Sequence, residues 1–167
     1  DGAATVAITN GEAAAGNANT AATNAGFTID ATAPTVALTY SKSTAAIGLG
    51  SLTLTATFSE SLATTPKLAI AAPGNVNDVA ATAMTGSGSV WTFAATIATG
   101  SDTDGAATVA ITNGEDAAGN ASSAATNDSF TIDTTAPTVA LTYSKSTAAV
   151  GLGSLTLTAT FSESLAT

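Results

Sequence analysis

The feature that most constrains this chain is an internal repeat of 103 residues. The segment DGAATVAITNGE begins at Asp1 and occurs again at Asp104. When the chain is shifted by that period, residues 1–64 align with residues 104–167, and seven of the 64 positions differ (13, 19, 20, 25, 26, 31 and 47 in the first copy). A period near 100 residues is too long for a solenoid repeat and is typical of one complete β-sandwich domain. We therefore expect a tandem array of similar domains.

Alternating apolar residues predict β-strands within each period. The run SLTLTATFS at 51–59 places Leu52, Leu54 and Phe58 on one face and threonines on the other, as expected for a half-buried strand. No segment shows a sustained helical period, and clusters of Gly, Asn and Asp separate the apolar runs. Seven strands are predicted per period, at residues 35–40, 51–59, 67–71, 78–84, 90–97, 106–112 and 124–132.

Two prolines mark the predicted domain boundaries. Pro34 and Pro137 end the segments TIDATAP and TIDTTAP, and each precedes a predicted strand, where a missing N–H is harmless. These segments are therefore predicted to be short, stiff linkers. The resulting parts are the last two strands of a preceding repeat (1–30), one complete repeat (31–133) and the first two strands of the next repeat (134–167). Because neither fragment buries a sheet face alone, we expect the chain to be a window on a longer array.

The charge balance excludes several partners. The chain has 12 acidic and three basic residues, for a net charge of −9, and its cations are Lys42, Lys67 and Lys145. No basic patch is expected to neutralise a phosphate backbone, so nucleic acid and anionic membrane surfaces are not expected partners. No apolar stretch reaches the length that spans a bilayer, so no membrane insertion is expected in this segment.

Enzyme activity is not expected. The chain contains no His and no Cys, which excludes a Ser-His-Asp triad and a zinc site. Glu60 and Asp116 are one conceivable acid–base pair for glycoside hydrolysis, but they lie in predicted surface turns and no aromatic sugar platform accompanies them. Trp91 alternates with Phe93 and Ile97 and is therefore predicted to lie in the core.

Acidic residues gather at both predicted ends of the domain. In a seven-strand sandwich, one end receives the linker and two loops that carry Asp30, Glu60, Asp116 and Asn120. The opposite end receives Asp102, Asp104 and Asp133, followed by Glu163 of the next domain. Calcium binds six to eight oxygen ligands, and carboxylates from both sides of a linker repel one another unless a cation bridges them. These eight residues are therefore candidate calcium ligands.

A second interpretation is that the same residues only form turns. Asp and Asn favour Asx-turns, and the segments SDTDG and DAAGN each place a Gly where a turn needs positive φ. The first copy of the repeat has Ala13 where the second has Asp116. If Asp116 is a ligand, the corresponding site of the preceding repeat is weakened or empty.

The runs TAPTVALTYS, SLTLTATFSE, DGAATVAITNGEDAAGN and FTIDTTAP resemble the bacterial immunoglobulin-like repeats of giant cell-surface adhesins, including the extender repeats of RTX-like adhesins. The resemblance covers essentially the whole chain. It implies an all-β fold of tandem immunoglobulin-like antiparallel β-sandwiches. It also implies an extracellular or cell-surface location, a role as a spacer that holds a binding module away from the cell, and calcium near the linkers.

Two functions remain open. In the first, the repeats form the stalk of a large secreted or cell-surface adhesin, and the partners of each repeat are its neighbours in the same chain. In the second, the chain is a subunit of an extracellular filament, sheath or surface layer, in which repeats of identical chains pack laterally or exchange strands within a fibre. A stalk predicts an elongated particle with little lateral contact, whereas a filament predicts extensive burial between chains.

Overall fold

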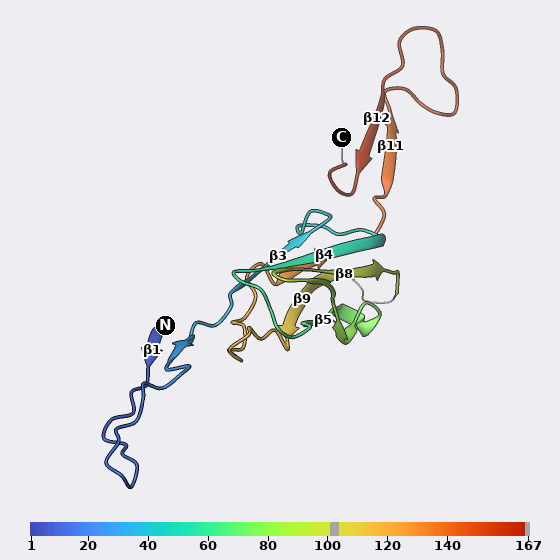
Figure 1. Ribbon diagram of the computed structural model, residues 1–167. Coiled ribbons are helices and arrows are strands. Elements are labelled where there is room, and N and C mark those ends of the chain that lie inside the picture. Colours follow the sequence, from blue (N-terminus) through green and yellow to red (C-terminus); the bar gives the residue numbers. More distant parts are fainter. Residues whose placement is uncertain (101–103, 166–167) are drawn as a thin grey trace. The chain divides into compact units, whose positions relative to one another are not determined.

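The structure is a computed structural model that describes residues 1–100 and 104–165. Two compact units are present, Asp1–Asp133 and Thr134–Thr167. The described residues form β-strands, turns and loops, with one short 3₁₀ turn at Pro73–Asn75 and no α-helix (Figure 1). All paired strands run antiparallel, in several small sheets. The prediction of an all-β protein is therefore confirmed.

One four-stranded sheet is built on the longest predicted strand. In order, it contains β3 (Val36–Tyr40), β4 (Gly50–Phe58), β8 (Val90–Ile97) and β7 (Thr85–Ser87). Val36 pairs with Phe58, and Leu54 pairs with Phe93. In β4 the buried residues alternate with exposed or half-buried ones, because period-two side chains point to opposite faces of a strand. The core face of this sheet is the apolar face that the alternation predicted.

The second four-stranded sheet joins strands from the middle and the end of the repeat. In order, it contains β10 (Ser129–Ile132), β9 (Gly105–Thr112), β5 (Lys67–Ala71) and β6 (Val79–Ala83). The register of β5 on β6 shifts between Leu68 and Ile70, whereas its register on β9 is regular. A shift of this kind is typical of an edge strand.

Buried side chains from both four-stranded sheets form one hydrophobic core. Trp91 of β8 lies in this core and donates its indole N–H to the carbonyl oxygen of Gly88 at 3.1 Å. Each fully buried aliphatic or aromatic side chain contributes about 1.5–3 kcal/mol to folding. The buried apolar side chains are Val36, Leu38, Ile47, Leu52, Leu54, Ala56, Phe58, Leu68, Ile70, Met84, Trp91, Ile97, Ala107, Val109, Phe130 and Ile132.

The prediction of a strand at 124–132 is wrong for residues 124–128. β10 begins only at Ser129, because Asn127 has a φ of 58°, a left-handed conformation that Asn tolerates and that interrupts a strand. The preceding residue pairs with the other sheet. Thr126 donates its N–H to Val36 O at 3.0 Å and accepts from Leu38 N at 3.1 Å. The chain therefore links the two sheets before it joins β9.

The chain passes from one sheet to the other at a second point, which was not predicted. The strand expected at 78–84 ends at Ala83, and β7 begins at Thr85 in the other sheet. Met84, between them, is buried and donates its N–H to Pro66 O at 2.9 Å. Alternation alone predicts which face of a strand is buried but does not say where the chain passes from one sheet to the other.

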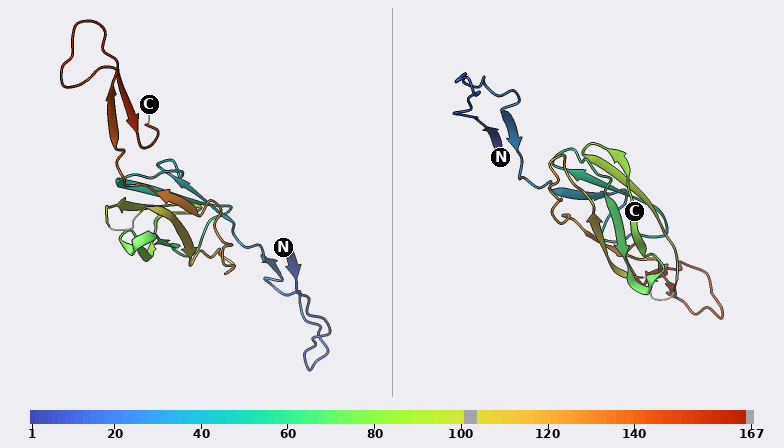
Figure 2. Two further views of the ribbon diagram at one scale, coloured as in Figure 1. Left: turned by 180° about the vertical axis from the view of Figure 1, so that it is seen from behind. Right: turned by 60° about the horizontal axis from the view of Figure 1, so that its bottom comes forward.

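The two ends of the chain form separate two-stranded sheets, β1 (Gly2–Thr5) with β2 (Gly26–Ile29) and β11 (Val139–Tyr143) with β12 (Leu157–Phe161). Gly2 pairs with Ile29 as Gly105 pairs with Ile132 in β9 and β10. The connection between β11 and β12 is an open loop (Figure 2). Two-stranded sheets of this kind are at best marginally stable by themselves.

Candidate functional site

The linker that leads from β2 into β3 is held by side chains on both sides. Asp1 accepts hydrogen bonds from Ala31 N, at 2.7 Å, and from the hydroxyl group of Thr32. Asp30 Oδ1 accepts from Thr32 N at 3.1 Å. At the β3 end, Thr35 N donates to Ser59 Oγ at 3.0 Å. The backbone N–H groups of Ala31, Thr32 and Thr35 are therefore bonded within the protein, which restricts the conformations of this linker.

Asp116 organises the loop between β9 and β10. Its Oδ1 accepts from Ala118 N at 2.8 Å and from Asn120 N at 2.9 Å, and its Oδ2 accepts from Asn120 Nδ2 at 2.8 Å. Burial acts to raise the pKa of the Asp116 carboxyl group, but the hydrogen bonds from Asn120 and Ala118 outweigh it and hold the pKa below its ordinary value. The predicted turn therefore forms, around an ionised carboxylate.

Asn120 connects this loop to the linker. Its side-chain Nδ2 donates both to Asp116 Oδ2 and to the main-chain carbonyl oxygen of Asp30, the latter at 3.1 Å. The same side chain therefore ties two segments that are 90 residues apart in the sequence. Asn120 acts here through its N–H₂ group, which cannot bind a cation, so any contribution to a metal site comes from its amide oxygen or from positioning.

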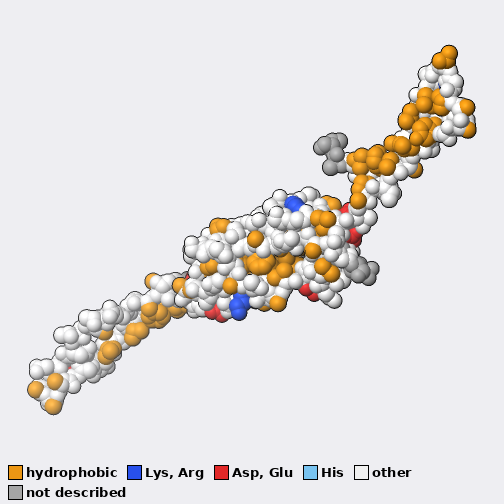
Figure 3. Space-filling model, turned by 90° about the vertical axis from the view of Figure 1, so that its right-hand side faces the viewer, with side chains coloured by type: hydrophobic (Ala, Val, Ile, Leu, Met, Phe, Trp, Pro, Cys, Tyr) orange, Lys and Arg blue, Asp and Glu red, His pale blue; other side chains and the backbone are white. Residues whose placement is uncertain are grey.

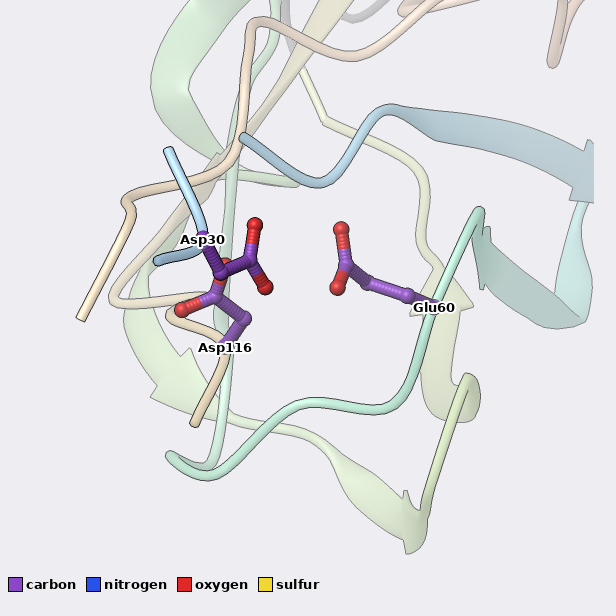
Figure 4. Close-up of side chains that lie close together, drawn as sticks. All are labelled: Asp30, Glu60 and Asp116. Atoms are coloured by element: carbon purple, nitrogen blue, oxygen red, sulfur yellow. The ribbon is translucent and has the colours of Figure 1, made fainter. Parts of the chain in front are cut away.

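Three carboxylates meet beside the linker. One carboxylate oxygen of Asp30, of Glu60 and of Asp116 all lie within 4.8 Å of one another. Asp30 follows β2, Glu60 follows β4, and Asp116 lies between β9 and β10. In Figure 4 the Glu60 side chain points toward the Asp30 and Asp116 carboxylates from the opposite side. In residues 1–100 and 104–165, these three form the one group of three or more metal-binding side chains this close together.

An open hollow adjoins the three carboxylates and gives solvent and ions access to two of them. Residues from the start of the chain, β2, the linker and the end of β4 line it, namely Asp1, Thr28, Ile29, Asp30, Thr32, Ser59 and Glu60. Asp30 is exposed and Glu60 is half-buried, whereas Asp116 is buried. A cation therefore has a direct route from solvent to this group.

The donor set fits calcium. Two like charges about 4 Å apart repel by ~1 kcal/mol in bulk water and ~4 kcal/mol at the effective dielectric constant of a protein surface, and a divalent cation reverses that balance. Carboxylate oxygens are hard ligands of the kind that Ca²⁺ binds. Asp116 already accepts three hydrogen bonds, which leaves about one of its four lone-pair directions for an ion. The remaining ligands of an ion here would be carbonyl groups and water.

The second predicted set of calcium ligands remains a prediction. Asp102 lies outside the described residues. Asp104 precedes β9 and Asp133 follows β10 in the first unit, while Glu163 belongs to the second unit. A shift of 103 residues makes Asp133 the counterpart of Asp30 and Glu163 the counterpart of Glu60. By this correspondence Asp133 and Glu163 would pair with each other, as Asp30 and Glu60 do, which differs from the grouping with Asp102 and Asp104 predicted above.

Three residues whose side chains form hydrogen bonds at the linker were not predicted, namely Asp1, Thr32 and Ser59. A signal for Asp1 was present, because Asp1 and Asp30 are the first-copy counterparts of Asp104 and Asp133, which were predicted to lie at the same end of a domain. The hydrogen bonds of Thr32 and Ser59 depend on the path of the linker. No periodicity or motif encodes that path.

Comparisons of the chain with protein-family models, with curated proteins and with solved structures found no match. Across residues 1–100 and 104–165, no helix is long and apolar enough to cross a membrane. The functional interpretation therefore depends on the repeat and on the geometry around the linker.

Proposed function

We propose that this chain is part of an extracellular stalk, in which tandem immunoglobulin-like β-sandwich repeats act as spacers of a large secreted or cell-surface bacterial adhesin. The observation that supports this proposal is the set of hydrogen bonds that join the linker to Asp1 and to Ser59. A linker whose N–H groups are bonded to Asp1 on one side and to Ser59 on the other transmits the orientation of one repeat to the next. In a spacer, a restrained linker of this kind is better suited to join successive repeats than a flexible one.

The positions of the two linkers support end-to-end assembly. The first linker is bonded at Ser59, directly after the last residue of β4. The second begins at Asp133, whose N–H bonds to Ile47 O just before β4. β4 has nine residues, and an extended strand rises by about 3.3 Å per residue, so the two ends of β4 are separated by about 26 Å. The two linkers are therefore bonded to the central repeat at opposite ends of β4.

We further propose that Asp30, Glu60 and Asp116 bind calcium and that the ion stiffens the linker. These residues come from the linker, from the end of β4 and from the loop between β9 and β10, so an ion shared among them joins three segments. Asn120 positions two of them by bonding to Asp116 and to the main chain of Asp30. In the stalk, this arrangement limits bending at the linker.

The calcium proposal is tested by thermal unfolding of the 167-residue chain in excess calcium and in excess chelator. A ligand at 100 times its dissociation constant stabilises the folded state by about 2.7 kcal/mol, so we expect calcium to raise the melting temperature by several degrees. Glu60→Gln removes one charged ligand and is expected to abolish most of this shift. Glu12→Gln changes an exposed residue of the same type in the preceding repeat and is the matched control.

A melting temperature that is the same in calcium and in chelator, or a shift that is equal in the wild type and in Glu60→Gln, contradicts the calcium site.

The stalk is tested separately, by small-angle X-ray scattering from polypeptides with two, three and four repeats. We expect the maximum dimension to grow in proportion to the number of repeats. A compact particle, or lateral association of the polypeptides, rejects the spacer and favours the filament.

A further inference from the structure

The first and last segments of the central repeat, residues 34–47 and 123–133, lie side by side and run in the same direction. They contain β3 and β10, which are edge strands of the two four-stranded sheets. Two isolated parallel bridges join these segments, namely Ala37 with Thr126 and Ile47 with Ile132. The paired strands within the two sheets all run antiparallel. The contact between the first and last segments is therefore distinct from the pairing within either sheet.

One part of this contact lies beside the linker that leads into β3, the entry linker. Ser123 donates its N–H to Pro34 O at 2.9 Å. Thr126 donates its N–H to Val36 O at 3.0 Å and accepts from Leu38 N at 3.1 Å. Because these bonds connect main-chain groups, they fix the register of the last segment on β3.

Two side chains hold the middle of the contact. Asn127 Nδ2 donates to Leu38 O at 2.9 Å, and the Tyr40 hydroxyl group donates to Asn127 O at 2.7 Å. Asn127 has a φ of 58°, and the chain continues from this turn into β10. The turn is therefore bonded to β3 through both its side chain and its main chain.

The other part of the contact lies beside the exit linker, which begins at Asp133. Thr131 donates its N–H to Thr44 O and accepts from Ile47 N, both at 2.8 Å. Asp133 donates its N–H to Ile47 O at 3.1 Å. The last segment is therefore bonded to the first at both of its ends.

Tension between the two linkers acts on this contact from opposite ends. The entry linker leads into the start of the first segment, and the exit linker begins at the end of the last segment. Since the two segments are parallel, these two points lie at opposite ends of the contact. Hydrogen bonds between strands run across the strand direction, so such tension loads the bonds of both parts together, in shear. A pull from one end of the contact would instead break the bonds one after another.

We propose that the first and last segments form a mechanical clamp, which makes the central repeat resist tension applied through its two linkers. Charged side chains are few on the face that Figure 3 shows, and the bonds of the contact join main-chain and uncharged polar groups. Salt therefore does not screen the clamp as it screens ion pairs. Tension along an array follows from the proposed stalk, whereas the clamp is a property of one repeat, so the clamp can fail while the stalk stands.

The test is force spectroscopy on the 167-residue chain in two pulling geometries. The chain contains no cysteine, so a pair of introduced cysteines gives unique attachment points. Ala33→Cys with Ala136→Cys pulls through the two linkers, whereas Ala33→Cys with Ala124→Cys pulls from one end of the contact, and all three alanines are exposed. Unfolding of the central repeat separates the attachment points by about 300 Å in either geometry. At one constant force, we expect unfolding to be at least about tenfold slower through the linkers.

A matched pair of asparagine variants tests the clamp at a single residue. Asn127→Gly removes the side-chain bond to Leu38 and keeps a residue that tolerates positive φ. Asn113→Gly is the control, because Asn113 also has a positive φ, 60°, and its side chain donates to Thr65 O at 2.9 Å, outside the contact. Pulled through the linkers, Asn127→Gly is expected to unfold about fivefold faster than the parent chain, and Asn113→Gly less than about twofold faster.

The fluorescence of Trp91, which is buried in the central repeat, checks that every variant keeps its fold. Equal unfolding rates in the two pulling geometries, or faster unfolding through the linkers, overturn the clamp. An Asn127→Gly variant that unfolds no faster than Asn113→Gly also contradicts it. If Asn127→Gly does not fold, the two geometries still decide the question, since neither alters a bonded residue of the contact.

Discussion

The same sequence occupies two different environments in this molecule. Leu38 in the central repeat is 1% exposed, whereas Leu141, its counterpart 103 residues later, is 53% exposed. Phe130 is 3% exposed, and its counterpart Phe27 is 53% exposed. Each member of a pair lies in a strand with the same register as the other. Strand pairing in these segments is therefore encoded locally, whereas the burial of Leu38 and Phe130 depends on the core that they share with β5 and β8.

Loop structure is also local. Lys42 Nζ donates to the carbonyl oxygens of Gly48 and Leu49, and Lys145 Nζ donates to those of Gly151 and Leu152. The loop after β3 thus has the same lysine contacts as the loop after β11. Packing differs in the same loops, because Ile47 is buried while Val150 is exposed. The hydrogen bonds of a segment therefore do not reveal whether its apolar side chains have found a core.

The comparison is tested most directly by replacing leucine with alanine at both positions, Leu38 and Leu141. Leu38→Ala is expected to lower the free energy of unfolding of the central repeat by about 2–5 kcal/mol, because it leaves a cavity in the core. Leu141→Ala removes an exposed side chain and is expected to change that free energy by less than about 0.5 kcal/mol. Urea unfolding followed by Trp91 fluorescence at low protein concentration measures both. Equal losses would show that residues 134–167 contribute to the same folded core.

The stability of the central repeat is expected to depend on Tyr40 at alkaline pH. The Tyr40 hydroxyl group donates to Asn127 O at 2.7 Å, and burial, followed by the negative charge of Asp128, raises the pKa of Tyr40 to about 12. Because this pKa exceeds the value of 10.0 for a free tyrosine, the stabilisation is complete below pH 10 and is lost as pH rises from 10 to 12.

We therefore expect the urea midpoint of the central repeat to fall between pH 10 and pH 12, and Tyr40→Phe to make this fall shallower. Tyr143→Phe, which alters the half-exposed counterpart in β11, is the control and should follow the wild type. An identical pH profile for the wild type and Tyr40→Phe would contradict the assigned role of the Tyr40 hydroxyl group.

The smallest expected effect concerns the loop between β9 and β10. The first copy has Ala13 in place of Asp116, yet Glu12 still pairs with Ala18 as Glu115 pairs with Ala121. Asp116→Ala is therefore expected to preserve the turn. Without the carboxylate acceptor, amide exchange at Ala118 and Asn120 should accelerate by about tenfold or more, as hydrogen exchange followed by NMR would show. Unchanged exchange rates would mean that the Asp116 carboxylate does not protect these two amides.

Much of the fold was predictable because strand positions follow from period-two alternation. The strands expected at 67–71 and 90–97 are β5 and β8, and the one expected at 51–59 differs from β4 by one residue at each end. The errors lie where the chain changes sheets, at Met84 and at Thr126. Alternation specifies the face of a strand but not its partner, and the left-handed Asn127 leaves no signal that distinguishes it from other turn residues.

The candidate site was predictable only in part. The grouping of Asp30, Glu60 and Asp116 followed from their positions in loops at one end of a seven-strand arrangement. The role of Asn120 differs from that of a simple ligand, because its N–H₂ group bonds to the linker and to Asp116. Which atom of an amide faces an ion depends on side-chain orientation, and no spacing in the sequence encodes that orientation.

The hydrogen bonds that restrain the linker affect the end-to-end length of an array of repeats. In an array with freely rotating joints, the distance between the two ends grows with the square root of the number of repeats. When each joint is fixed by bonds such as those from Asp1 to Ala31 and from Thr35 to Ser59, that distance grows in direct proportion to the number of repeats. In the stalk that we propose, one more copy of the 103-residue unit would therefore add the length of one domain.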